Sequence, residues 1–260
     1  MPQPKYLASA FFIAAIGGLI LTTALASRQQ GTNEQKTAKQ KNPDFSRFPL
    51  VDFHAPQPVD ENLRAAREAK GRKYNNKHMP QISEETYQVF SNSDWDVRLP
   101  ALPVEGSAAV VIGTVTSARA YLTPDKTGIY SEFHVATETV IKNDPDNKIQ
   151  AGAPITVERA GGRVRMPSGK IVISWVNHQN MPRAGVRYVL FLTHEFETRN
   201  DTPKDFYLLT GYELRDGEVH LLDDTQPGHP ITRYDGAPET TLLSDLVNTV
   251  ALRNFILARL

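Results

Sequence analysis

The 260-residue sequence contains no cysteine, and its 29 basic residues are balanced by 29 acidic ones. The missing cysteines exclude disulfides, thiolate metal sites and cysteine nucleophiles. The zero net charge argues against nucleic acid as a partner, because proteins that bind it carry an uncompensated basic face. It argues equally against attachment to a membrane surface through a polybasic patch.

Motifs that identify the common enzyme classes are also missing. The chain has no G-x-S-x-G nucleophile elbow, no P-loop and no G-x-G-x-x-G turn. None of its seven histidines stands four residues from another, as the metal-binding histidines of a zinc helix do. The pairs close enough in sequence to offer two metal ligands are Glu132 with His134, and His220 with Asp223 or Asp224. We therefore expect no cofactor, no bound metal and no catalytic residues.

One long apolar run is present, because residues 6–26 carry no charged side chain. Such a run can cross a bilayer as a helix, whereas Ala24-Leu25-Ala26 resembles a signal-peptide cleavage site. The segment can therefore be interpreted either as a membrane anchor or as a signal peptide. Either would place the remainder outside the cytoplasm, in the periplasm or at the cell surface, and cleavage after Ala26 would make it secreted. By the positive-inside rule, the opposite orientation is favoured by the basic residues that follow the run, Arg28, Lys36, Lys39 and Lys41.

The next segment, residues 27–93, is polar and predicts a linker, because it offers little apolar surface to offset the entropy of ordering. Its proline-punctuated part, residues 43–58, contains aromatic side chains that either dock on the following domain or stay loosely ordered. We place the boundary of the following domain near Asp94, which divides the chain into residues 1–26, 27–93 and 94–260.

Two short helices are expected within this polar segment. Residues 60–71 begin with Asp60, a good N-cap, and end with Gly71 at the position typical of a C-terminal glycine. Their apolar content is low, so we expect a solvated helix. A second helix is expected over residues 83–90, which start with Ser83 and two glutamates.

A long hairpin is expected to organise residues 94–260. The apolar run 108–115 and the β-rich run 129–141 flank residues 123–128, which have turn chemistry. The alternation of apolar and polar side chains along the second run predicts a strand with one face toward the core and one face toward solvent. The expected core face is Ile129, Phe133, Val135 and Ile141, and the expected solvent-exposed face is Tyr130, Glu132, His134 and Glu138.

Shorter strands follow, separated by turn signals such as Asp216-Gly217. They are expected at residues 154–159, 164–166, 171–173, 187–192, 206–210, 212–214 and 219–221. From residue 238 onward, apolar side chains recur every three or four residues, which predicts an amphipathic helix that closes the domain. The expected fold is mainly β, with the strands in a barrel or sandwich and this helix packed against them.

The order of five segments carries a resemblance to a known family. The segments are Val110–Val115, Phe133–Lys142, Gly152–Val157, Gly161-Gly162 and Gly185–Phe191. Together they resemble the netrin-like barrels found in tissue inhibitors of metalloproteinases, which implies an OB-like antiparallel barrel, closed or partly open. In those inhibitors a disulfide-bonded N-terminal cysteine engages the protease metal, so this cysteine-free chain is not expected to share that activity. The chain is also similar, over residues 125–133 and 208–214, to exported proteins of environmental bacteria with no assigned activity.

The strongest candidate binding site is a glycine-rich hairpin whose backbone N–H groups and basic side chains suit an anion. Its residues are Arg159, Gly161, Gly162, Arg163, Arg165 and Lys170. The loop between Tyr121 and Tyr130 is a second candidate. We expect an extracytoplasmic β-barrel module, tethered to the membrane through residues 6–26, that binds a protein or a small polar ligand, such as a small anionic ligand. The alternatives are a hydrolase-like or metal-assisted enzyme with a His/Asp/Glu site formed only on folding, and a structural scaffold of the cell envelope.

Overall fold

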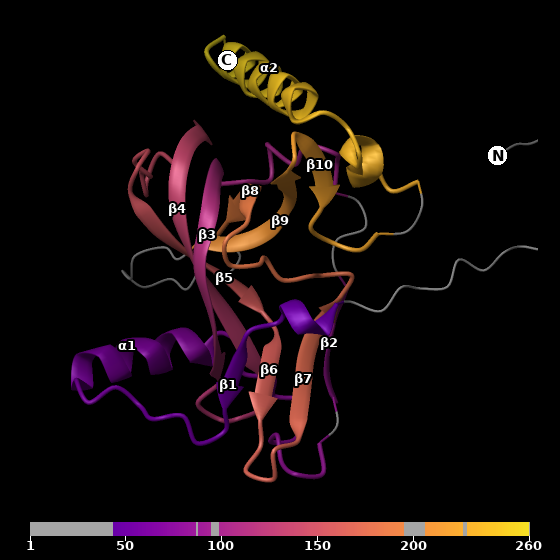
Figure 1. The fold of residues 1–260 in the computed structure, drawn as a ribbon. Helices are drawn as coiled ribbons and strands as arrows, with labels where there is room; N and C mark the ends of the chain where they lie inside the picture. The colour runs from indigo at the N-terminus through magenta and orange to yellow at the C-terminus, as the bar shows by residue number, and fades with distance from the viewer. Residues whose placement is uncertain (1–43, 87, 95–98, 195–205, 226–227, 260) are drawn as a thin grey trace, which may run out of the picture. The chain divides into compact units, whose positions relative to one another are not determined.

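Five strands close into a barrel in the computed structural model of the chain, which describes residues 44–86, 88–94, 99–194, 206–225 and 228–259 (Figure 1). The barrel strands are β3 (Ala109–Leu122), β4 (Ile129–Lys142), β5 (Pro154–Ala160), β8 (Arg187–Thr193) and β9 (Phe206–Arg215). Their order is β3-β4-β5-β9-β8, and β8 pairs back to β3. Neighbouring strands are antiparallel except β5 and β9, which run parallel. The expected mainly β fold is confirmed.

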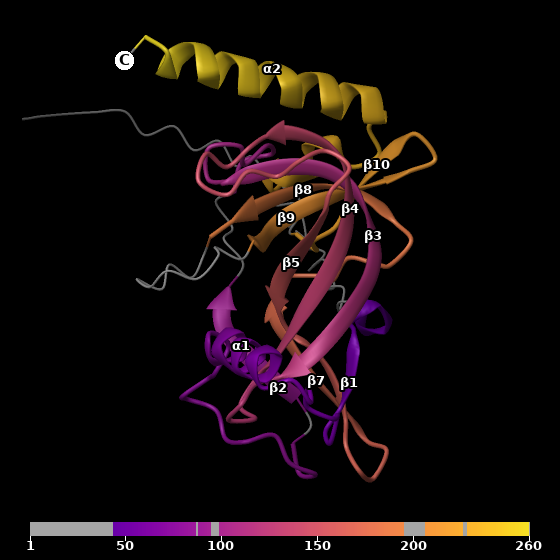
Figure 2. The same cartoon turned by 90° about the vertical axis from the view of Figure 1, so that its left-hand side faces the viewer.

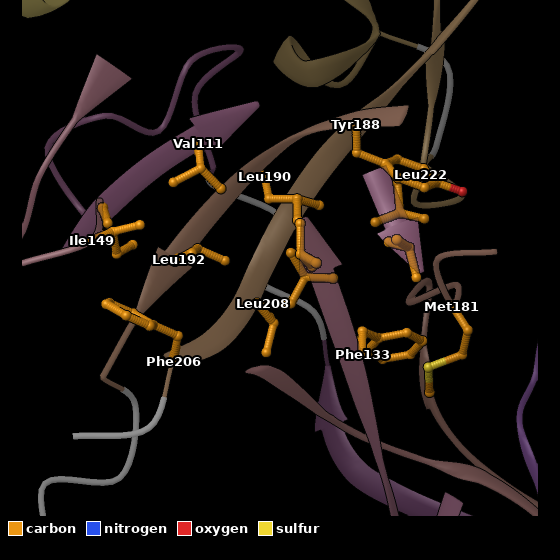
Figure 3. Close-up of a cluster of buried hydrophobic side chains, with 14 of the residues drawn as sticks. Val111, Phe133, Ile149, Met181, Tyr188, Leu190, Leu192, Phe206, Leu208 and Leu222 are labelled. Carbon is orange, nitrogen blue, oxygen red and sulfur yellow. The ribbon is translucent and has the colours of Figure 1, made fainter. Parts of the chain in front are cut away.

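The inside of the barrel is filled by apolar side chains from all five strands. Val111, Phe133, Val157, Leu190 and Leu208 belong to one cluster, and each is almost completely buried. Figure 3 shows Val111, Phe133, Leu190 and Leu208 gathered there. Complete burial of one such side chain contributes roughly 1.5–3 kcal/mol. Burial of this cluster therefore contributes substantially to the stability of the barrel.

A second cluster covers the outside of β3, β8 and β9. Outward residues such as Ile112 and Val189 pack with Leu242 and Leu246 of α2 (Glu239–Leu257). The short helix η2 (Pro230–Tyr234) and β10 (Glu218–Leu221), which pairs with β9, complete this layer. The predicted C-terminal helix is confirmed, and so is the turn at Asp216-Gly217, where both residues have positive φ. The expected packing of the helix's apolar residues holds for its first part only, because Phe255 and Ile256 are half or more exposed.

Four further strands, none of which belongs to the barrel, form a second sheet. It contains β1 (Leu50–Asp52), β6 (Gly162–Arg165), β7 (Ile171–Asn177) and β2 (Gln88–Asp94), in the order β1-β6-β7-β2. The β6–β7 pair is the predicted hairpin. Strands β1 and β2 come from the segment that we expected to be a linker, and each runs parallel to its neighbour.

The expected boundary near Asp94 does not separate two compact units. Contacts group residues 41–260 together, so much of the 27–93 segment belongs with the barrel. Phe48, which follows the short helix η1 (Phe45–Arg47), is almost fully buried in the interior cluster. The aromatic residues of this segment therefore dock, as one of the two alternatives predicted.

The prediction of a helix over residues 83–90 is wrong. Residues 83–86 form a turn, and β2 follows at Gln88. The backbone N–H of Ser83 donates to Thr86 Oγ1 at 2.9 Å, and the N–H of Glu85 donates to Ser83 Oγ at 3.3 Å. Such local side-chain bonds compete with helical hydrogen bonding, and here pairing with β7 decides the outcome.

Irregular pairing between β3 and β4 changes the predicted faces of the long hairpin. Ile112 pairs with Thr139 and Gly113 with Thr137, so Glu138 has no partner residue in the ladder. A bulge of this kind reverses the alternation beyond it. Ile141 consequently packs in the outer cluster rather than on the interior face of Phe133, and this part of the prediction is wrong.

The helix expected over residues 60–71 is present as α1 (Glu61–Arg72). The Asp60 carboxylate caps it by accepting the N–H of Leu63 at 2.8 Å. Gly71 lies inside the last turn rather than beyond it, and a Cβ there would stand 2.8 Å from Pro124 Cδ. The glycine thus permits close contact between α1 and the tip of the β3–β4 hairpin. Tyr130, expected on the solvent-exposed face, is fully buried in a cluster with Tyr74, two residues beyond the end of α1.

The predicted anchor or signal segment, residues 6–26, lies outside the described residues. Among the residues that are described, no helix has both the length and the apolar character required to cross a bilayer. Membrane tethering therefore stays a prediction.

Candidate anion-binding pocket

A pocket of about 410 Å³ opens between β1 with the loop that follows it, α1, and the tip of the β3–β4 hairpin. Two aromatic rings line it, Phe53 and Tyr121. Three cationic side chains line it as well, those of Arg67, Arg119 and Lys126. Its volume falls in the range of small-molecule sites, and its lining combines apolar surface with a few charged groups, as such sites do.

The hairpin tip that supplies Lys126 is held by its own side chains. One oxygen of Asp125 accepts hydrogen bonds from Thr123 Oγ1 at 2.9 Å, and from the N–H and Oγ1 of Thr127 at 3.1 and 2.8 Å. Burial opposes ionisation of Asp125, but these hydrogen bonds outweigh it and hold the pKa of the carboxyl below its usual value. Lys126 has a φ of 59°, a strained value for a residue with a side chain. Its ammonium lies 4.3 Å from the centre of the Phe53 ring.

Helix α1 is fixed to the barrel by a buried ionic contact beside the pocket. Lys70 Nζ lies 2.7 Å from Glu158 Oε1 and 3.1 Å from Glu132 Oε1. The Tyr74 hydroxyl donates to Glu158 Oε2 at 2.7 Å. Because these contacts reach strands β4 and β5, they fix where α1 lies along these strands and which side of the helix faces them. Arg67, one turn earlier, is thereby placed with its guanidinium 4.8 Å from the centre of the Tyr121 ring.

Tyr121 presents a neutral ring to the pocket. It stacks on Tyr130 at 5.3 Å between centroids, and Tyr130 stacks in turn on Tyr74 at 4.7 Å. Burial, reinforced by the Glu132 carboxylate, raises the pKa of Tyr121 above its usual value. The phenol therefore stays uncharged at neutral pH and adds no negative charge that would oppose an anion.

The charge around the pocket is unevenly compensated. The two acidic residues of the lining are paired with cations outside it, Asp52 with Arg165 at 3.5 Å and Glu68 with Arg72 at 3.3 Å. Within the described residues, none of the three lining cations forms an ion pair with an acidic side chain. Arg67, Arg119 and Lys126 therefore leave their charges available to a ligand.

The six residues of the predicted glycine-rich site are not brought together around one surface. Arg159 is completely buried and paired with Asp223. The remaining basic side chains separate: the Arg163 Nε–H donates to the Phe48 carbonyl at 2.8 Å, Arg165 pairs with Asp52, and Lys170 donates to the Glu84 carbonyl. Arg163 also lines a second, more open pocket of about 330 Å³ together with Arg47 and Arg183. Gly161 and Gly162 have positive φ and lie against other parts of the chain.

The histidine and acid pairs singled out in the sequence do not meet. His134 Nδ1 contacts Thr156 Oγ1 at 3.2 Å, while Glu132 contacts Lys70. Asp223 is occupied by Arg159 rather than by His220. Within the described part of the chain, no group of three or more His, Asp or Glu side chains is placed to hold a metal ion.

A histidine–acid contact that sequence spacing did not indicate joins His194 to Asp144. Burial opposes ionisation of Asp144, but hydrogen bonds from His194 Nε2 and from the Asp146 N–H lower its pKa below the usual value. The ionised carboxylate therefore stabilises the fold above the pKa of the unfolded chain, and this contribution is lost as the pH falls through the folded-state pKa.

We expect the free energy of unfolding in urea to decline from about pH 5 to about pH 3, with part of the decline due to Asp144. The Asp144→Asn variant should show a shallower decline than the unmodified chain. The exposed Asp216, changed to asparagine, is the matched control and should retain the original slope. Equal slopes for Asp144→Asn and the unmodified chain would contradict the assignment.

Sequence reasoning found part of the pocket and missed the rest. The loop between Tyr121 and Tyr130, the second candidate, contributes Lys126 and one aromatic wall. Arg67 was expected on a solvated helix, and Arg119 carried no motif. Comparison of the sequence with protein-family models and with curated proteins gave no match.

Proposed function

We propose that this chain is an extracytoplasmic β-barrel module that binds a small anionic ligand carrying an aromatic or flat apolar group. The observation that carries the proposal is a set of three cationic side chains, Arg67, Arg119 and Lys126, around a pocket walled by Phe53 and Tyr121. None of the three is paired with an acidic side chain of the part of the chain that the structure describes. Cations attract the anionic group, and aromatic faces favour a flat group beside it. The tether is the apolar segment 6–26, which would hold the module at the membrane.

The proposal includes an OB-type barrel. In chain order the barrel strands are β3, β4, β5, β8 and β9, and their spatial order places the fifth strand between the third and the fourth. The parallel pairing of the third and fifth strands supports this type. OB folds commonly bind ligands near the loop that joins their first two strands. That loop is residues 123–128 here, and it forms one side of the pocket.

The test measures binding of phenyl phosphate and of inorganic phosphate to the full-length chain by titration calorimetry. We expect phenyl phosphate to bind more tightly, because the apolar wall that Phe53 provides would contact its ring. Replacing Arg119 with glutamine should weaken binding of both probes by about tenfold or more, since a hydrogen bond to a charged group contributes roughly 1.5–3 kcal/mol. Arg64→Gln is the matched control: this arginine lies on α1, pairs with Glu61 at 3.8 Å and does not line the pocket.

A second variant separates the aromatic wall from the charges. Phe53→Leu keeps an apolar side chain but removes the ring, so it should weaken phenyl phosphate and leave inorganic phosphate unchanged. Absence of saturable binding for both probes, or an equal loss in the Arg64→Gln control, would contradict the proposed site.

A further inference from the structure

The last two turns of α2 expose an apolar surface that the barrel does not cover. Leu242, Leu246 and Val250, in the first part of the helix, are buried against the outer cluster. Beyond them, Leu252, Phe255, Ile256 and Leu257 are each half or more exposed, at 61, 54, 50 and 53%. In Figures 1 and 2 this end of α2 extends away from η2 and β10. The helix thus has a docked first part and an undocked apolar end.

The exposed side chains are distributed around the helix rather than on one stripe. Successive residues of an α-helix turn by about 100°, so Leu252, Phe255 and Ile256 cover one side while Leu257 points to another. Val247, 55% exposed, lies on a further side of the helix, about 140° around from Leu252. Apolar side chains that are exposed on more than one side of a helix need an apolar environment that extends around the helix. A single flat protein surface would leave part of this end in water.

The charged side chains at this end are all positive. From residue 246 to residue 260 the charged side chains are Arg253 and Arg259, with no acid between them. The Arg259 guanidinium lies 4.0 Å from the centre of the Phe255 ring, so cationic and apolar groups occupy the same surface. Apolar residues flanked by arginines are the composition of helices that enter the headgroup region of anionic membranes.

We infer that the C-terminal two turns of α2 dock on the surface of an anionic phospholipid bilayer. A second copy of the chain fits less well, because four half-exposed side chains offer roughly 400 Å² per chain, about half of what each partner contributes to a standard interface. A bilayer surface surrounds an inserted helix end and needs no matching shape. The inference does not depend on the ligand pocket, because no residue of α2 lines it.

The cysteine-free chain allows a direct test, because a single introduced cysteine is the only labelling position. Phe255→Cys is labelled with an environment-sensitive fluorophore in the full-length protein, which is reconstituted into phosphatidylcholine vesicles with or without phosphatidylglycerol. A lipid-borne quencher should quench this label about threefold more than a label at Leu63→Cys when phosphatidylglycerol is present. Leu63 is the matched control, a leucine 64% exposed on α1.

Neutralising both charges, Arg253→Gln with Arg259→Gln, should weaken the lipid contact about 30-fold in the anionic vesicles, at about 1 kcal/mol per arginine. Equal quenching at positions 63 and 255 would overturn the inference. It would also be overturned by an unquenched Phe255→Cys variant that cross-links in high yield to a second copy. Binding of phenyl phosphate, measured on the same preparation, tests the pocket independently of the lipid contact.

Discussion

Replacing Asp223 with alanine is expected to lower the free energy of unfolding by about 3–5 kcal/mol, because it leaves the buried Arg159 charge without its partner. The two side chains are completely buried and joined by paired hydrogen bonds of 2.8 Å, from Nη1 to Oδ1 and from Nη2 to Oδ2. The same carboxylate accepts the Asn180 N–H at 2.9 Å and the Thr210 hydroxyl at 2.8 Å. The substitution therefore removes four hydrogen bonds together with the countercharge.

Urea denaturation of the full-length chain measures this loss. Asp52→Ala is the matched control, because Asp52 also pairs with an arginine, Arg165, but at 3.5 Å and with both side chains more than half exposed. An exposed pair contributes about 1 kcal/mol or less. If the two alanine variants lose similar stability, the buried pair is not the determinant that we describe.

Arg159 also shows where sequence reasoning stops. Its neighbours in sequence, Arg163 and Arg165, suggested a shared basic surface, and nothing in the local pattern indicated otherwise. The partner Asp223 is 64 positions away, beyond β9 and β10. An ion pair of this separation exists only because the barrel brings β5 beside β9. A cluster of charged residues in the sequence therefore predicts a charged surface only when it is known which face of the strand each residue lies on.

The features that the sequence did predict are those that local chemistry determines. Asp60 predicted the start of α1, and Asp216-Gly217 predicted a two-residue turn, because each acts within a few residues. The sequence did not predict strands β1 and β2, because these segments become strands only by pairing in parallel with β6 and β7. Both partners are distant along the chain. The candidate pocket was half predicted for the same reason: the hairpin loop was recognisable, whereas its position opposite Arg67 depends on how α1 docks.

The contact between the barrel and the second sheet depends on a close approach at the end of β5. Gly161 has a φ of 105°, and a Cβ there would lie 2.8 Å from the Ser174 carbonyl oxygen and 2.8 Å from Met181 Cε. Its own N–H donates to the Ile129 carbonyl at 2.8 Å, and its carbonyl accepts the Ser131 hydroxyl at 2.7 Å. The glycine is therefore held on both sides and has no room to move away from an added methyl group.

We expect Gly161→Ala to lower the free energy of unfolding by about 3–4 kcal/mol, combining the unfavourable φ with displacement of β7. Gly169→Ala is the control that separates these two causes. Gly169 has a similar φ of 87° but nothing within 4 Å of an added Cβ, so it should lose only about 1–2 kcal/mol. Equal losses would mean that backbone conformation alone explains the effect. A larger loss at Gly161 means that crowding against β7 adds to it, as it must if this glycine allows the barrel and the second sheet to meet.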